Sequence, residues 1–132
     1  MPYLNIDDHY PEHPKIDALS DGAFRLHVAA MAYCAKELSD GTVPMSKVRR
    51  LTPNYRPAHL SELIVSRRFH RGGEGCGTDY CPIGTSGEVV VHDYLEWNKS
   101  KQWWEDKRAA DAKRLKRWRD EQAAKEAGER RV

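Results

Sequence analysis

The sequence predicts an α+β domain that is mainly helical. Apolar residues at helical spacing and helix-capping residues recur along the chain, whereas strand-forming runs occupy only a few short segments. The chain has 132 residues, the length of one domain. Its apolar share of 39% and charged share of 32% indicate a small core, with part of the chain left in solvent.

The first 41 residues predict an arm and a helix. Three prolines within residues 1–18 favour extended or turning backbone, so we expect an arm that lies on the domain. Ser20 is placed to cap the helix, and Gly41 suits the left-handed position at its end. Cys34 is expected to be a core residue on the apolar face of this helix. That face consists of Phe24, Leu26, Val28, Met31, Cys34, Ala35 and Leu38.

Residues 42–65 predict a short strand followed by two helices. Residues 42–44 are prone to β structure, and Ser46 can cap a short helix that runs through Leu51. Residues 52–55 have the composition of a turn. Pro57 then opens the next helix at a first-turn position, where proline is tolerated. The inward stripe of that helix consists of Leu60, Leu63 and Ile64.

The rest of the chain predicts a hairpin and a terminal helix. Residues 67–71 and the β-branched run at 88–92 flank a Gly-rich insert at 72–87. Ser100 can cap a helix that runs from about Lys101 into the 120s, with a charged composition and a fraying end. We therefore expect a domain over residues 1–98 and a projecting charged helix and tail over 99–132.

This order of elements is typical of a winged helix-turn-helix, here with a long insert in the wing. In such domains the helix after the turn enters the DNA major groove, and the hairpin flanks it on the phosphate backbone. Residues 45–71 carry seven basic residues and one acidic residue, whereas residues 1–44 and 72–98 are net acidic. The sequence thus predicts double-stranded DNA as the partner. The candidate contacts are Lys47, Arg49, Arg50, Asn54, Arg56, His59, Arg67, Arg68 and Arg71.

Several strings carry a resemblance to a known group of proteins. They include Leu38-Ser39-Asp40-Gly41, Leu60-Ser61-Glu62-Leu63 and His92-Asp93-Tyr94-Leu95-Glu96-Trp97-Asn98. Over roughly residues 1–120, the chain resembles small helix-turn-helix proteins of actinobacteria and their phages. Those proteins are similar to the N-terminal domains of phage replication-initiation, or replisome-organiser, proteins. The resemblance implies a DNA-binding winged helix of bacteriophage type, acting in replication initiation or in transcription regulation.

The wing insert contains a candidate metal site. Cys76 and Cys81 lie between His70 and His92, and two thiolates with two imidazoles suit tetrahedral Zn²⁺. A structural zinc ion would also order a Gly-rich tip that has no core of its own. A pairing of Phe69 with His92 would turn His70 to the opposite face of the hairpin. The alternative is a flexible loop with two free thiols and His92 bonded to nearby backbone.

The terminal helix carries large apolar residues between its charges. We expect Trp103, Trp104, Leu115 and Trp118 to dock the helix on its own domain or on a second copy, which would form a homodimer. The charged stretch after Arg119 would then be available to phosphates. A second functional hypothesis is a non-enzymatic adaptor, whose winged helix and Trp-bearing tail bind a host or phage protein.

Other classes of protein find little support in the sequence. No nucleophile elbow, phosphate loop or metalloprotease motif is present, so we predict that the protein is not an enzyme. No apolar run approaches the ~18–20 residues needed to span a bilayer. The N-terminal segment also lacks the basic and apolar stretches of a signal peptide. We therefore expect a cytoplasmic protein of a bacterial host cell, with no membrane partner.

Overall fold

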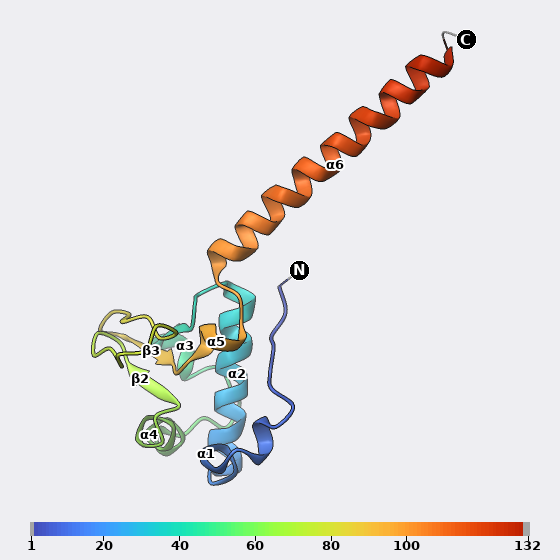
Figure 1. Cartoon of the computed structure of the whole chain (residues 1–132). Coiled ribbons are helices and arrows are strands. Elements are labelled where there is room, and N and C mark those ends of the chain that lie inside the picture. The colour runs from blue at the N-terminus through green and yellow to red at the C-terminus, as the bar shows by residue number, and fades with distance from the viewer. Residues whose placement is uncertain (1, 131–132) are drawn as a thin grey trace. The chain divides into compact units, whose positions relative to one another are not determined.

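The computed structural model describes residues 2–130 and confirms a mainly helical α+β chain (Figure 1). Residues up to Ser100 belong to one compact unit and those from Lys101 to a second, and each unit is described by itself. The elements are η1 (Tyr10–Glu12), α1 (Pro14–Asp17), α2 (Asp21–Glu37), β1 (Thr42–Pro44), α3 (Met45–Val48), α4 (Pro57–Val65), β2 (Phe69–Arg71), β3 (Glu88–Val91), α5 (Tyr94–Trp97) and α6 (Lys101–Arg130).

Helix α2 is the core helix of the first unit. Ser20 caps it as predicted, because its hydroxyl accepts a hydrogen bond from the Ala23 amide at 3.3 Å. The predicted end at Gly41 is wrong, since α2 ends at Glu37 and Leu38 takes the left-handed C-cap conformation with φ 52°. Gly41 instead lies in the turn before β1, where an added Cβ would approach the Tyr94 Cβ to 3.1 Å.

The N-terminal arm is less extended than predicted. Pro11 and Pro14 stand in the first turns of η1 and α1, where a missing amide proton leaves no helical hydrogen bond unmade. The Tyr10 ring packs against the Phe24 and His27 rings of α2, with centroids 5.6 Å away in both cases. The Tyr10 hydroxyl also hydrogen-bonds with Nδ1 of His27. Tyr10 therefore attaches the arm to α2.

Helices α3 and α4 follow β1. Helix α3 ends at Val48 rather than Leu51, and it begins at Met45 with Pro44 as its N-cap, so Ser46 does not cap it. The Met45 amide donates to the Gly87 carbonyl at 2.9 Å. Pro57 opens α4 as predicted.

Two contacts connect α4 to the start of α2. The Glu62 carboxylate accepts hydrogen bonds from the Ser20 amide at 2.9 Å and hydroxyl at 2.5 Å, and these bonds lower its pKa. The His59 ring covers Gly22 so closely that an added Cβ would lie 2.2 Å from Nε2. Both contacts set the position of α4 against α2.

The three strands form one antiparallel sheet in the order β1-β3-β2, which includes the predicted hairpin. Phe69 faces Val91 and His70 faces Val90 across the hairpin. Strand neighbours point to opposite faces, so only one face joins the core beside α2. The core residues are Ala23, Leu26, Ala30, Met31, Cys34, Val43, Val48, Leu63, Phe69, Val89, Val91 and Tyr94.

Helix α5 was not predicted from the sequence. Asp93 adopts a left-handed conformation with φ 53° and starts a helical turn in which Tyr94 is buried. Helix α6 continues to Arg130, beyond the predicted 120s, and contains no buried side chain among its described residues. Its Leu115 and Trp118 side chains are 47% and 57% exposed. No helix within residues 2–130 has both the length and the apolar content needed to cross a membrane.

The pair of Tyr10 and His27 predicts a pH-dependent stability. Burial, together with the positive charge of Arg68, lowers the pKa of His27 from 6.5 to about 4. Between these pH values His27 is protonated in the unfolded chain but neutral in the folded chain. The free energy of unfolding should therefore fall as the pH drops from 6.5 to 4, by at most about 1.4 kcal/mol per pH unit. Urea unfolding over this range measures the slope.

The His27→Gln variant is the control, because it retains every other titratable group. Its unfolding free energy should vary less steeply over the same range. Identical slopes for the two proteins would contradict the assignment of this titration to His27.

Candidate functional site

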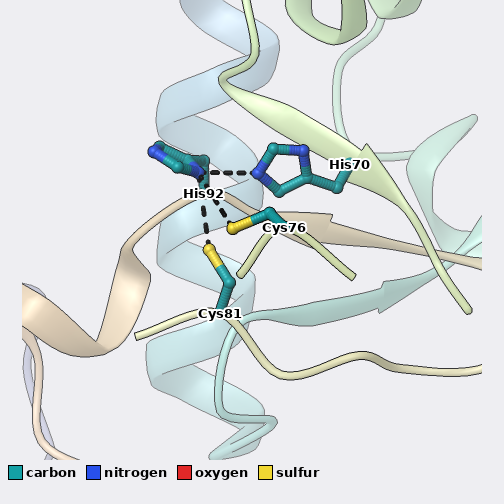
Figure 2. Close-up of side chains that lie close together, drawn as sticks. All are labelled: His70, Cys76, Cys81 and His92. Atoms are coloured by element: carbon teal, nitrogen blue, oxygen red, sulfur yellow. Dashed lines mark hydrogen bonds between the residues drawn. The ribbon is translucent and has the colours of Figure 1, made fainter. Parts of the chain in front are cut away.

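The structure brings His70, Cys76, Cys81 and His92 together, as Figure 2 shows. One potential ligand atom from each lies within 4.8 Å of the other three, so the group could hold a metal ion. The Nδ1 atom of His92 is 2.6 Å from Nε2 of His70, 3.4 Å from Sγ of Cys81 and 3.8 Å from Sγ of Cys76. All four side chains therefore converge on one point.

The hairpin register decides that both histidines face this point. Phe69 pairs with Val91 and not with His92. The side chains of His70 and His92 therefore do not point to opposite faces of the hairpin. His70 lies opposite Val90, and His92 follows two residues after Val90 on the same face of the hairpin. The His92 amide donates to the Arg68 carbonyl at 2.8 Å, which extends the pairing by one bond.

Glycines let the wing insert fold back over the hairpin. Gly75 and Gly77, on either side of Cys76, have φ values of 69° and 81°, which side chains disfavour. An added Cβ at Gly72 would lie 1.8 Å from the Thr85 carbonyl oxygen. The insert passes close to Val90, since an added Cβ at Gly84 would lie 3.1 Å from that side chain. Val90 is consequently only 1% exposed although it points away from the core.

Asp93 supports the four residues from outside, and sequence reasoning missed it. Its carboxylate lies 3.0 Å from Nε2 of His92, which leaves Nδ1 to face the other three residues. The same carboxylate accepts a hydrogen bond from the Thr78 hydroxyl at 2.9 Å, and the Asp93 amide donates to Sγ of Cys81 at 3.0 Å. A carboxylate behind a ligating histidine is the common outer support of metal sites. Its position directly after His92 was the available signal.

The surroundings of the site lower the pKa of both imidazoles and of one of the two thiols. Burial lowers the pKa of both His70 and His92, although the Asp93 carboxylate opposes the shift. Burial raises the pKa of the Cys81 thiol to about 11. Burial also acts to raise the pKa of Cys76, but hydrogen bonds from Thr78 and Cys81 outweigh it, and the pKa lies below its usual value. Metal ligation requires neutral imidazole and thiolate.

Two of the distances between the ligand atoms match those of a tetrahedral site. Bonds of about 2.0–2.3 Å at tetrahedral angles separate neighbouring ligand atoms by roughly 3.3–3.8 Å. The distances from Nδ1 of His92 to the two sulfurs, 3.4 and 3.8 Å, match that range. The two imidazole nitrogens are closer, at hydrogen-bond distance.

Most of the predicted DNA contacts lie on exposed positions. They follow one another from α3, through the turn, to the start of α4, and then to β2 at the base of the wing. The exposed members are Lys47, Arg49, Arg50, Asn54, Arg56, Arg67 and Arg71.

Two other predicted contacts are partly buried. His59 packs on Gly22, and its Nδ1 is buried without a hydrogen-bond partner among residues 2–130. Arg68 lines a cavity of about 590 Å³ beneath the N-terminal arm, together with Tyr10 and Asp93. Burial lowers the pKa of its guanidinium, whose Nε likewise has no partner in the described chain. His59 and Arg68 are thus partly enclosed by neighbouring residues, whereas the other seven candidate side chains are exposed to solvent.

Comparison with protein-family models, with curated proteins and with solved structures gives no match to this chain.

The candidate metal site predicts a stability that depends on bound metal. Removal of metal by a chelator should lower the melting temperature of the natural protein, because the insert has few apolar contacts of its own. The Cys81→Ser variant should melt at a lower temperature and should not respond to the chelator. Thermal unfolding with and without chelator, followed by circular dichroism, measures both effects.

The Cys34→Ala variant tests whether thiol loss alone explains the result. Cys34 is buried in the core on α2, far along the chain from the insert, and burial raises its pKa to about 11. This variant should keep the full chelator response. An unchanged melting temperature of the natural protein after chelation would contradict a structural metal.

Proposed function

We propose that the protein is a non-enzymatic, DNA-binding winged helix whose wing is held by a structural zinc ion. The observation that carries the proposal is the succession of exposed basic side chains along α3, the following turn, the start of α4 and β2. The sheet order β1-β3-β2 is compatible with a winged helix, in which the strand before the helix-turn-helix pairs with the returning strand of the wing.

The basic residues supply affinity for the phosphate backbone. Residues 45–71 have a net charge of +6, with seven basic residues and one acidic residue. Lysine and arginine contacts to phosphates release condensed counterions, which makes binding strong at low salt and weak at high salt. Such contacts position a protein on the duplex without reading its sequence.

The exposed face of α4 offers few groups for reading bases. Ala58, Ser61 and Val65 are exposed on it, and Val65 is 83% exposed. Glu62 is already bonded to Ser20, which makes it a poor candidate for a cytosine amino group. Arg56 at the N-cap of α4 is therefore the best-placed side chain for a guanine edge. Asn54 in the preceding turn is the second candidate.

Zinc is the metal that this donor set favours. Two sulfurs and two imidazole nitrogens in tetrahedral arrangement suit Zn²⁺, and four protein ligands leave no open position for catalysis. His70, Cys76, Cys81 and His92 would hold the ion, which would fasten the insert over Val90. A fixed wing keeps Arg67 and Arg71 at a constant distance from α4, which favours simultaneous contact with the backbone.

The biological setting follows from the resemblance stated for the sequence. Likeness to phage replication-initiation domains favours a role in replication initiation or in transcription regulation. The adaptor hypothesis remains the competing interpretation, and the DNA-binding measurements below distinguish the two.

The exposed basic surface predicts two kinds of variant. Replacement of both Arg49 and Arg50 by Ala should weaken binding to all duplexes alike and lower the slope of log K against log salt by about 1 for each lost contact. Arg56→Ala should instead reduce the preference among sequences. Fluorescence anisotropy over a salt series, with duplexes from the neighbourhood of the gene and unrelated duplexes, measures both.

A matched control replaces Arg25 and Lys36, which are exposed on α2 outside this surface. It removes the same charge and should bind as the natural protein does. Absence of DNA binding by the natural protein at low salt would overturn the proposal and favour the adaptor.

The zinc centre predicts a distinct role for Asp93. Purified protein should contain about one zinc ion per chain by elemental analysis. Asp93→Asn should weaken zinc affinity by about 10–100-fold, because the carboxylate orients His92 and raises its basicity. Competition with a chromogenic chelator measures the affinity. Asp79→Asn, an exposed change in the same insert, should leave it unaltered.

A further inference from the structure

The middle of α6 is the most strongly charged segment of the described chain. Residues 107–119 contain seven basic residues and one acidic residue, a net charge of +6 within 13 positions. The basic residues are Lys107, Arg108, Lys113, Arg114, Lys116, Arg117 and Arg119. The segment forms one uninterrupted helix with no buried side chain. It therefore presents its charge entirely at the surface of α6.

Few of these charges are neutralised within the helix. Asp111 pairs with both Lys107, at 3.0 Å, and Arg114. The other basic residues of the segment form no ion pair within residues 2–130. Several basic residues of the segment lie three or four positions apart, as Lys113 and Arg117 do. Like charges at this spacing repel each other on a helix. A polyanion bound to the segment would remove that repulsion.

The distribution of charge around α6 disfavours a membrane surface and an in-register parallel copy of α6 as occupants. At about 100° per residue, the basic side chains cover all but roughly 100° of the circumference. The remaining strip holds Leu115 and Trp118 but is interrupted by Asp111, so it is narrower than the apolar face of a helix that lies on a membrane. A second copy of α6, aligned at the same position, would place one +6 segment against another. The strip between the basic side chains offers only Leu115 and Trp118 as apolar contacts for such a pair.

We propose that residues 107–119 of α6 are a second contact with duplex DNA, separate from the surface of α3, α4 and the wing. The segment is about 20 Å long and, with side chains, about 10–12 Å wide. The major groove of B-form DNA is about 12 Å wide and admits an α-helix. Phosphates line both edges of that groove, which suits a helix with basic residues on three sides. The partner is the one in the proposed function, but the surface is different.

The test uses the full chain and replaces three charges at a time. One variant carries Lys113→Gln, Arg114→Gln and Arg117→Gln, since glutamine has nearly the helix propensity of the residues it replaces. The control carries Lys101→Gln, Lys125→Gln and Arg130→Gln, which lie on α6 outside the segment. Binding to mixed-sequence duplex DNA is measured by anisotropy over a salt series, and helix content by circular dichroism.

The first variant should bind roughly tenfold or more weakly at low salt, with a salt slope reduced by up to about 3. The control should bind nearly as the natural protein does, with both variants equally helical. Equal DNA binding by the two variants would overturn the proposal. A lower molecular mass of the first variant alone, measured by analytical ultracentrifugation, would also overturn it. The latter result would assign the segment to a homodimer.

A third protein separates this proposal from the proposed function. It carries Arg49→Ala, Arg50→Ala and Arg56→Ala with α6 intact. Full binding by this protein, together with loss in the α6 variant, would support the inference and contradict the proposed winged-helix surface. The reverse pattern would retain that surface and overturn the inference. Failure of the natural protein to bind DNA would overturn both.

Discussion

The register of the β2–β3 hairpin is the constraint on which the first unit depends. Phe69 lies opposite Val91, and this pair faces the core. His70 lies opposite Val90, and this pair faces the insert. Because side chains alternate along a strand, a shift of one residue would exchange the two faces. It would expose the core residues and turn a potential metal ligand inward, so packing and chemistry select the same register.

The insert and the hairpin depend on each other. Val90 is buried on the face away from the core, where the insert approaches it at Gly84. The insert in turn is attached to β3 by the backbone hydrogen bond from the Gly72 amide to the Glu88 carbonyl, at 2.8 Å, and by the group of Cys76, Cys81 and the two histidines. Bound metal would therefore stabilise tertiary structure on one face of the sheet while leaving the helical core on the other face unchanged.

The charged side chains of the first unit differ in their exposure and in their hydrogen bonds. Basic residues on α3, α4 and β2 are mostly exposed, but Arg68 is held under the N-terminal arm near Asp93. Glu62 is committed to the start of α2 through Ser20. Composition alone counts all of these charges equally. Burial and hydrogen bonding decide which remain available to a partner.

Local sequence determined the longer helices, the hairpin and the residue types of the candidate metal site, because capping, helical periodicity and β-branched runs act over a few positions. It correctly placed the Ser20 cap and Pro57. It misplaced the end of α2, since Leu38 takes the left-handed C-cap conformation that glycine most often supplies. It also could not decide whether His70 and His92 meet, or that Asp93 supports them. Those facts depend on strand register and on a loop folding back, which are contacts between residues distant in the chain.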